Sequence, residues 1–429
     1  MKAQIAGFQI DATPPIGTPL CFGSCGLAKT IVAPLTARGV ILWAEQWPPV
    51  VLCAVDWLGI GNDSHDAWRQ ALAEAVGTDT ERVAVHTLHL HDAPGTDLEA
   101  SRLLAEWGFP DDLPVCEFER GVIARAAEAA RQAKGRPRPV THIGVGKSRV
   151  FQFASNRRIL GADGKVQWTR WSSCEQDDLR LRPEGVVDPY VRQMCFWEEQ
   201  SPVAILTYYA SHPQSFYGRG AVSPDTVGLA RGLREATIPA ALHLHFDGAG
   251  GNVAAGKYND GTPPVRFELA RRLAEGMEAA WNGAVRLPMA SLDMQWRVKT
   301  VALPLARRLQ KQADDRPDAQ ANMASRRGMA RDINFARRVR SGRRIDLTCL
   351  RIGPVSMLHM PGELFVEYQL AAQDMRPGEL VCMAAYGDYG PGYIGTRIAY
   401  EQGGYEPSQS RVAPDVEDLL LSGIRDLLK

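Results

Sequence analysis

The chain has 429 residues, of which 45% are hydrophobic and 23% are charged, and its 49 basic residues balance 49 acidic ones. This composition is typical of a globular protein with one large or two medium domains. Because the formal net charge is zero, nothing global indicates a nucleic-acid partner or an anionic membrane surface.

The N-terminal segment has no long apolar stretch, and no apolar run reaches the roughly 18 residues of a membrane span. Eight cysteines are scattered through the chain without a Cys-x-x-Cys pair. We therefore expect a cytoplasmic protein with reduced cysteines and without stable membrane association.

The first eighty residues predict a strand–helix–strand unit. Apolar strands are expected over 5–10, 40–44 and 50–57, followed by an amphipathic helix that begins at Asp63-Ser64 and ends at Gly77. Asp56 stands at the end of the most apolar of these strands. We expect it either to cap a helix or to support a site residue.

The stretch from Val83 to Thr96 begins as a β-branched apolar run and ends in a Pro-Gly turn, so it predicts a buried strand that opens into a loop. Side chains alternate along a strand, which would put His89 and His91 on one face, next to Asp92. Such residues are either metal ligands or acid/base groups on a rigid base, or buried histidines bonded to backbone carbonyls.

The middle of the chain repeats this alternation. A helix is expected over 117–134 and strands over 140–146 and 203–210; the latter delivers His212 just past its end. The polar turn at Arg157 is either solvated or turns an arginine into a pocket to hold a carbonyl, carboxylate or phosphate. A strand at 242–246 leads into a glycine-rich loop at 247–256. This loop is able to bring backbone amides close to a ligand, but it is not a P-loop. A long helix is expected over 264–282.

Residues 307–344 differ in composition from the rest, with twelve basic residues against four aspartates. The pattern predicts a helical hairpin broken near Pro317 and Gly328. The alternatives are a solvated hairpin beside the main domain, a nucleic-acid surface, or a cationic lid over an anionic substrate. Because no aromatic ladder accompanies the charge, we expect no nucleic-acid partner.

Strands return at 352–360 and 380–386. The first runs into Pro361-Gly362-Glu363, a tight turn that suits a metal ligand or a helix cap, and the second precedes Tyr393, with Tyr405 twelve residues later. The alternation predicts an α/β fold: a single domain over 1–429 with a mixed β-sheet core, flanking helices and a basic helical insertion at about 305–344.

Read in order, these segments resemble the catalytic domain of the neutral/alkaline (non-lysosomal) ceramidase family. The resemblance covers most of residues 3–429 and rests on seven motifs in the same order: 10–15, Leu88-His89-Leu90-His91-Asp92-Ala93-Pro94-Gly95, His212-Pro213, 248–255, Pro361-Gly362-Glu363, Gly392-Tyr393-Ile394-Gly395-Thr396, and Tyr405. It implies a Zn²⁺ ion held by two imidazoles, a carboxylate and a phenolate, namely His89, His212, Glu363 and Tyr393. It also implies that His91, Arg157 and Tyr405 line the pocket and polarise or protonate the scissile group.

This sequence departs from the family at Ala254, where the family pattern has a serine treated as part of the catalytic machinery. We therefore expect a zinc-dependent hydrolase of an amide (N-acyl) bond that uses a zinc-activated water. In this mechanism His91 acts as general base or acid, and Arg157 and Tyr405 stabilise the oxyanion. The alternatives are an ester or sugar-derived substrate in the same pocket, or a zinc-containing binding protein without catalysis.

The substrate is expected to be a small molecule other than a secreted ceramidase's sphingolipid. The sequence shows no signal peptide, no accessory C-terminal domain, alanine at position 254, and no amphipathic stretch that would dock a membrane. These features fit a substrate that is smaller and more polar than ceramide and that could be anionic. The basic segment would then form the rim of the pocket or a lid over it.

Overall fold

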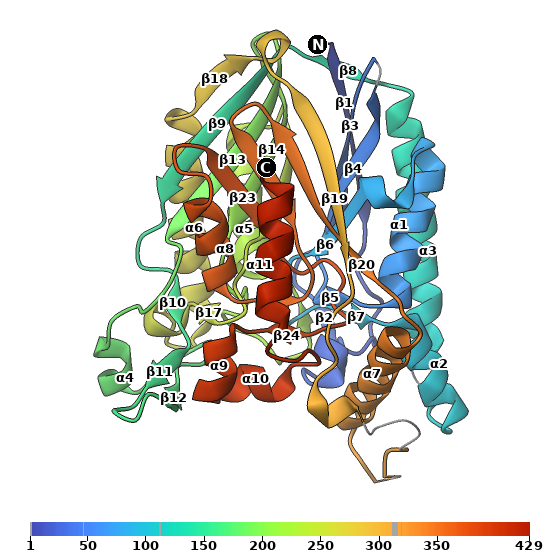
Figure 1. Ribbon diagram of the computed structural model, residues 1–429, viewed down its shortest axis with the longest axis vertical. Coiled ribbons are helices and arrows are strands. Elements are labelled where there is room, and N and C mark those ends of the chain that lie inside the picture. The colour runs from blue at the N-terminus through green and yellow to red at the C-terminus, as the bar shows by residue number, and fades with distance from the viewer. Residues whose placement is uncertain (1, 46, 111–112, 311–315, 319) are drawn as a thin grey trace.

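A computed structural model describes residues 2–45, 47–110, 113–310, 316–318 and 320–429. Three mixed sheets form the framework (Figure 1). The first has the order β6 (Val83–Thr87), β4 (Trp47–Val55), β3 (Thr36–Ala44), β1 (Ala3–Asp11), β8 (Arg138–Val140). The second is β16 (Leu242–Asp247), β14 (Ser201–Tyr209), β13 (Tyr190–Glu198), β9 (His142–Arg149), β18 (Val285–Pro288). The third is β19 (Met294–Val301), β20 (Ile345–Ile352), β21 (Val355–His359), β23 (Leu380–Ala384).

Short two-stranded pairs complete the strand inventory of the described residues. They are β10 (Ser155–Asn156) with β17 (Val253–Ala254), β11 (Arg158–Leu160) with β12 (Val166–Thr169), β15 (Ala221–Val222) with β2 (Thr30–Ile31), β22 (Glu363–Leu364) with β24 (Tyr393–Ile394), and β5 (Gly59–Ile60) with β7 (Gly95–Thr96).

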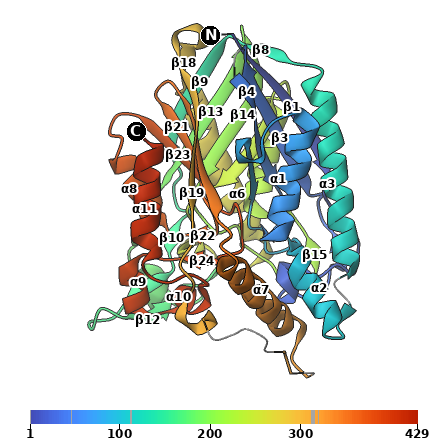
Figure 2. The ribbon, with the colours of Figure 1, turned by 45° about the vertical axis from the view of Figure 1, so that its right-hand side comes forward.

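Helices cover the outer faces of the sheets. Figures 1 and 2 show α1 (Asp63–Val76) and α3 (Leu113–Lys134) outside the first sheet, and α8 (Val366–Asp374) and α11 (Val416–Leu427) outside the third. The second sheet contacts α5 (Asp225–Thr237) and α6 (Pro263–Asn282). The remaining helices are α2 (Leu98–Glu106), α4 (Asp177–Leu181), α7 (Met323–Arg340), α9 (Arg397–Gln402), α10 (Tyr405–Gln409). The predicted α/β class with a mixed-sheet core and flanking helices is confirmed.

The first two sheets share one continuous apolar core, which explains why inner strands such as β3 and β14 are almost wholly buried rather than alternating. The sheets come very close where β1 crosses β16. A Cβ atom at Gly7 would lie 2.7 Å from the end of the Leu242 side chain, which would have to shift to accept a larger residue there.

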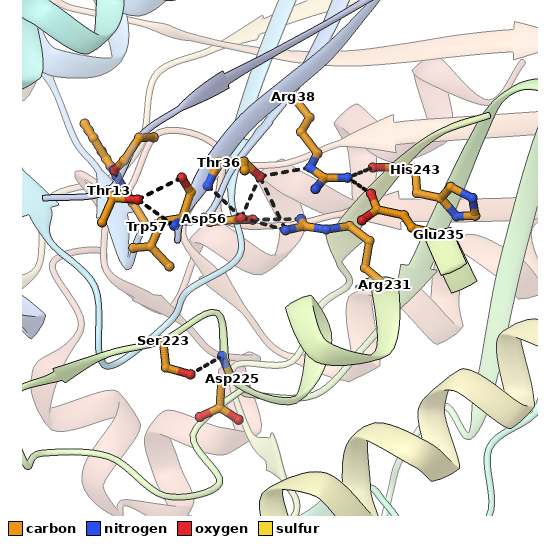
Figure 3. Close-up of polar contacts among 12 residues, drawn as sticks. Thr13, Thr36, Arg38, Asp56, Trp57, Ser223, Asp225, Arg231, Glu235 and His243 are labelled. Carbon is orange, nitrogen blue, oxygen red and sulfur yellow. Dashed lines mark hydrogen bonds and ion pairs between the residues drawn. The ribbon is translucent and has the colours of Figure 1, made fainter. Parts of the chain in front are cut away.

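A buried polar network crosses from the first sheet to α5 and β16 (Figure 3). The Asp56 carboxylate accepts hydrogen bonds from the Arg231 guanidinium at 2.6 and 2.8 Å and from the Thr36 hydroxyl at 2.7 Å. Arg38 of β3 donates to the carbonyl of His243 in β16 at 2.9 Å and pairs with Glu235. Asp56 therefore neither caps a helix nor contacts the site: it pairs with a cation 175 residues away.

The carboxyl ends of β6, β14, β16, β21 and β23 point to the same end of the molecule, where both views place α7, α9 and α10. The polar motifs that follow these strands are therefore brought together there, as ligand sites commonly are in α/β folds. Within the described residues, no helix is long and apolar enough to cross a membrane.

Two predicted elements need correction. The strand expected to carry His89 and His91 ends at Thr87, because His89 adopts a positive φ of 54° that an extended strand does not allow. The break expected near Gly328 in the segment 305–344 is absent, because α7 runs continuously from Met323 to Arg340; a 3-10 helix lies at Arg307–Leu309, and residues 311–315 and 319 lie outside the described residues. Several of its arginines are not simply solvated, since Arg338 pairs with Asp63 and Asp66 on α1.

Candidate metal centre and active site

His89, His212 and Glu363 meet at the centre of the strand-end region. The Glu363 Oε2 atom lies 3.3 Å from His89 Nε2 and 3.1 Å from His212 Nε2, and all three residues are buried. His91 is close by, and one ring nitrogen from each of His89, His91 and His212 lies within 4.8 Å of the other two. The group is able to hold a metal ion.

The hydrogen bonds of the two buried imidazoles test whether a cation fits. His89 Nδ1 faces the Leu58 carbonyl at 3.0 Å, and His212 Nδ1 faces the Gly250 carbonyl at 2.7 Å. Carbonyls only accept hydrogen bonds, so each Nδ1 carries a proton, and the two Nε2 atoms, whose lone pairs bind a metal when the rings are neutral, face the Glu363 carboxylate. Lone pairs aimed at one carboxylate oxygen repel unless a cation lies among them, and carbonyl-bound imidazoles of this kind are typical of metal ligands.

Charge and burial oppose each other in this group. Burial lowers the pKa of His212 to about 3 against the opposing pull of Glu363. Burial alone would raise the pKa of Glu363, but the neighbouring His89 and His212 outweigh it and hold that pKa well below its usual range. At neutral pH the site therefore presents an anionic Glu363 carboxylate beside a neutral His212 ring, which suit a divalent cation.

Glu363 and Tyr393 are register partners on β22 and β24. The Tyr393 hydroxyl accepts a hydrogen bond from Arg157 Nη1 at 3.3 Å, and its ring stacks on that of His212 at a centroid distance of 6.2 Å. Burial, followed by Glu363, raises the pKa of Tyr393 well above its usual value. An adjacent cation favours the phenolate, so Arg157 opposes this shift.

Arg157 is buried and pairs with Glu406 at 3.3 Å. Burial alone would lower its pKa, but Tyr393 and Glu406 outweigh it and raise the pKa. Tyr405 packs its ring edge-on against Tyr393, at 5.9 Å between centroids, and is 41% exposed. The predicted turn at Arg157 is therefore not solvated but faces the site.

His91 links the metal group to two cysteines, Cys21 and Cys25, that the sequence analysis did not single out. Its Nδ1 lies 3.7 Å from the Cys21 sulfur, and its buried Nε2 has no hydrogen-bond partner among the described residues. Hydrogen bonding from Cys25, with His91, lowers the pKa of Cys21 well below its usual value. Burial would lower the pKa of His91, but the Cys21 thiolate outweighs it and raises that pKa.

The glycine-rich loop after β16 packs against the segments that carry His212 and Glu363. Gly250 supplies the carbonyl for His212, and the Gly251 N–H donates to the Leu364 carbonyl at 2.8 Å. A Cβ atom at Gly251 would lie 2.4 Å from the Glu363 carbonyl oxygen, so the loop approaches as only glycine allows. Ala254, at the departure from the family pattern, is fully buried and forms a β-bridge with His212.

A cavity of about 220 Å³ opens onto this group. His89, His91, Glu363, Tyr393 and Tyr405 line it, as do residues that the sequence did not single out. Those additional lining residues include Cys21, Tyr389, Arg331 and Arg411. Tyr389 hydrogen-bonds through its hydroxyl to Glu363 Oε1, a contact with no local sequence signal.

The chain resembles known proteins in structure but not in sequence. No family model and no curated protein matches the sequence. The whole chain nevertheless superposes on a ceramidase complexed with C2, at a TM-score of 0.71 and 15% identity over 75% of that chain. It superposes equally on neutral ceramidase from Pseudomonas aeruginosa, at a TM-score of 0.72 and 15% identity over 74% of that chain. The chain has the neutral ceramidase fold.

The neutral ceramidase fold confirms the architecture that the seven motifs predicted. At 15% identity the likeness concerns the fold alone, so the chemistry of this chain has to be argued from its own side chains.

Proposed function

We propose that this protein is a zinc-dependent hydrolase of N-acyl (amide) bonds, with the ion held by His89, His212, Glu363 and Tyr393. The observation that carries the proposal is the pair of carbonyl-bound imidazoles whose free nitrogens face one carboxylate oxygen at 3.1 and 3.3 Å. Two nitrogens, one carboxylate and one phenol oxygen form a ligand set that suits Zn²⁺ and leaves room for water.

When bound, zinc would supply Lewis acidity and lower the pKa of a coordinated water toward neutrality. The surrounding residues have separate tasks. His91 keeps a buried ring nitrogen without a partner among the described residues, and this nitrogen is available to accept or return a proton. Arg157, fixed by Glu406, directs its N–H groups to the oxygen of Tyr393 and into the region where an acyl oxygen would gain charge. Tyr405 offers a second hydroxyl at the cavity wall.

The proposed mechanism does not require a hydroxyl at position 254, because none of its steps uses a side-chain nucleophile. Similarity to ceramidases supports an amide as the scissile bond, since those relatives share the fold.

Metal analysis and an activity panel test the proposal together. Protein purified without added metal is expected to contain about one zinc per chain. The double variant His89→Ala/His212→Ala is expected to lose the zinc, whereas His142→Ala, a histidine of β9 outside the cavity lining, keeps it. The variant His91→Ala distinguishes metal binding from proton transfer. If His91 carries a proton and is not a zinc ligand, the variant is expected to retain zinc and lose turnover.

The panel compares N-acyl amides, acyl esters and glycosides, with and without chelator. Turnover of amides that disappears with zinc removal supports the proposal. Turnover that is indifferent to zinc, or zinc retained in the double variant, would refute it, and zinc binding without turnover of any compound would favour a binding protein.

A further inference from the structure

Arg331 is a cation in the wall of the same cavity that opens onto Glu363 and the histidines. It projects from α7 and is partly buried. Its guanidinium carbon lies 3.5 Å from the ring centroid of Phe22 and 5.1 Å from that of Tyr389. Because Tyr389 hydrogen-bonds to Glu363, a single aromatic ring connects this cation to the proposed metal ligand.

The acids around Arg331 are engaged elsewhere. Asp332 pairs with Arg411 at 2.6 Å and with Arg308. Asp97 caps α2 and accepts hydrogen bonds from the side chains of Asn62 and Asn334, each at 2.7 Å. Within the part of the chain that the structure describes, no carboxylate forms an ion pair with Arg331.

The cavity wall therefore carries a positive charge that no carboxylate of the described residues pairs with. Glu363 is the one acid among its described lining residues, and a metal ion at the centre would neutralise it. Arg411, the other cation of the wall, is already balanced by Asp332. Burial, with Arg411 beside it, lowers the pKa of Arg331 to about 10 although Tyr389, Asp97 and Asp332 favour the charged form, so the charge is present at neutral pH without a direct ion pair among the described residues.

The stacking of Arg331 also fixes which part of its guanidinium is available. The guanidinium carbon lies over the rings of Phe22 and Tyr389, and these cation–π contacts leave the N–H donors, which lie in the guanidinium plane, free of an acceptor. An arginine held in this way matches the two oxygens of a carboxylate with little loss of side-chain freedom. A long alkyl chain in the same place would bury the guanidinium without a hydrogen bond, which is unfavourable.

We propose that the substrate is an N-acyl compound bearing a carboxylate, and that Arg331 binds this carboxylate while the amide lies at the metal centre. This assignment rests on the proposed amide-hydrolase function and adds the substrate class to it. N-acyl amino acids and amides of dicarboxylic acids belong to that class.

The test uses zinc-loaded enzyme and two substrate pairs that differ in one carboxylate. N-acetylphenylalanine against N-acetylphenethylamine varies the charge on the amine side, and N-succinyl- against N-butyrylphenethylamine varies it on the acyl side. At least one acid is expected to exceed its neutral partner in kcat/KM by about tenfold or more, mainly through KM. In Arg331→Met that ratio is expected to fall to about one, with Arg331→Lys in between.

Arg326→Met is the matched control, because Arg326 lies on the same helix, also stacks on a phenylalanine, Phe109, at 4.0 Å, and is outside the cavity lining. It is expected to keep the wild-type ratio. No preference for either acid, or a preference that survives in Arg331→Met, would overturn the assignment. Circular dichroism and thermal unfolding confirm that each variant is folded before its ratio is interpreted.

Binding separates this inference from the proposed function. Calorimetry with N-acetylphenylalanine measures affinity whether or not the amide is cleaved. If no amide is turned over but Arg331→Met weakens binding by about tenfold or more, the carboxylate site stands and the hydrolase proposal fails. Equal affinity of wild type and variant overturns the carboxylate site itself.

Discussion

The phenol hydroxyl of Tyr389 donates a hydrogen bond to Oε1 of Glu363, the carboxylate whose other oxygen faces His89 and His212. This bond orients the carboxylate, because it occupies the oxygen that points away from the imidazoles. Partners of this kind hold metal ligands in place and raise metal affinity.

Tyr389→Phe is therefore expected to weaken zinc binding by about 10- to 100-fold, since the ring remains and the donor is lost. Competition against a fluorescent zinc chelator measures the affinity. Tyr386→Phe is the matched control: its ring stacks on His89 at 4.6 Å, but its hydroxyl has no hydrogen-bond partner among the described residues. Equal losses in both variants would contradict the role of Tyr389.

Cys21 is expected to react as a thiolate over a wider pH range than Cys25. Hydrogen bonding from Cys25, together with His91, lowers the pKa of Cys21, whereas the thiol of Cys25 has its pKa raised by Cys21 and by burial. A group with a lowered pKa stays ionised as the pH falls, so zinc-free protein at pH 6 should be alkylated by iodoacetamide about tenfold faster at Cys21 than at Cys25. Peptide mass spectrometry reads both sites in one digest. In His91→Gln the Cys21 rate should drop, and an unchanged rate would show that His91 does not stabilise the thiolate.

The Asp56–Arg231 pair is expected to contribute strongly to stability. Both side chains are buried, so Asp56→Asn leaves the Arg231 charge uncompensated and should lower the free energy of unfolding by about 3 kcal/mol. Glu268→Gln, in an exposed pair with Arg271 on α6, should lower the free energy of unfolding far less, because solvent screens that pair. Urea denaturation at pH 7 compares the two.

The pH dependence of the same pair has a defined sign. Burial alone would raise the pKa of Asp56, but Arg231 and Arg38 outweigh burial and lower it. Its contribution is therefore fully present above the unfolded-state pKa of about 3.9 and is lost as the pH falls through the folded-state value. The difference between wild type and Asp56→Asn should stay constant from pH 7 to 5 and narrow below about pH 4. A difference that narrows already at pH 6 would assign the effect to another group.

Ala254→Ser restores the hydroxyl of the family pattern beside His212. Because Ala254 is fully buried, the added oxygen is expected to lower stability by about 1 kcal/mol while zinc content stays the same. Wild type should cleave short-chain N-acyl compounds faster than fluorescent long-chain ceramide, and the variant should keep this order. Faster cleavage of long-chain ceramide by wild type would show that the family substrate survives the missing serine.

Local patterns sufficed for much of the fold. The apolar runs predicted most strands, and helical spacing with Gly77 predicted α1, because these signals depend on neighbours in the chain. The positive φ of His89 had no such signal, since it is set by the turn that the chain makes after β6. The sequence also could not predict that Asp56 pairs with Arg231, because an ion pair between segments 175 residues apart depends on tertiary packing.

For the candidate site, the order of motifs predicted which residues lie together, whereas each residue taken alone left its role open. It grouped His89, His212 and Glu363, which the structure brings together. It gave no indication of Tyr389 or Arg331, whose positions depend on how α7 and the loop after β23 pack around the cavity. Compositional analysis could only present the basic segment as a choice among surface, nucleic-acid site and lid.

The four proposed ligands, His89, His212, Glu363 and Tyr393, come from segments spread over three hundred residues and follow strands of all three sheets. No fragment that ends before β24 contains the complete set. Metal uptake would then be a late event in folding, because long-range strand pairing has to precede it. An ion bound only by the finished chain would also stabilise the whole molecule by mass action, so zinc supply would govern how long the folded protein survives.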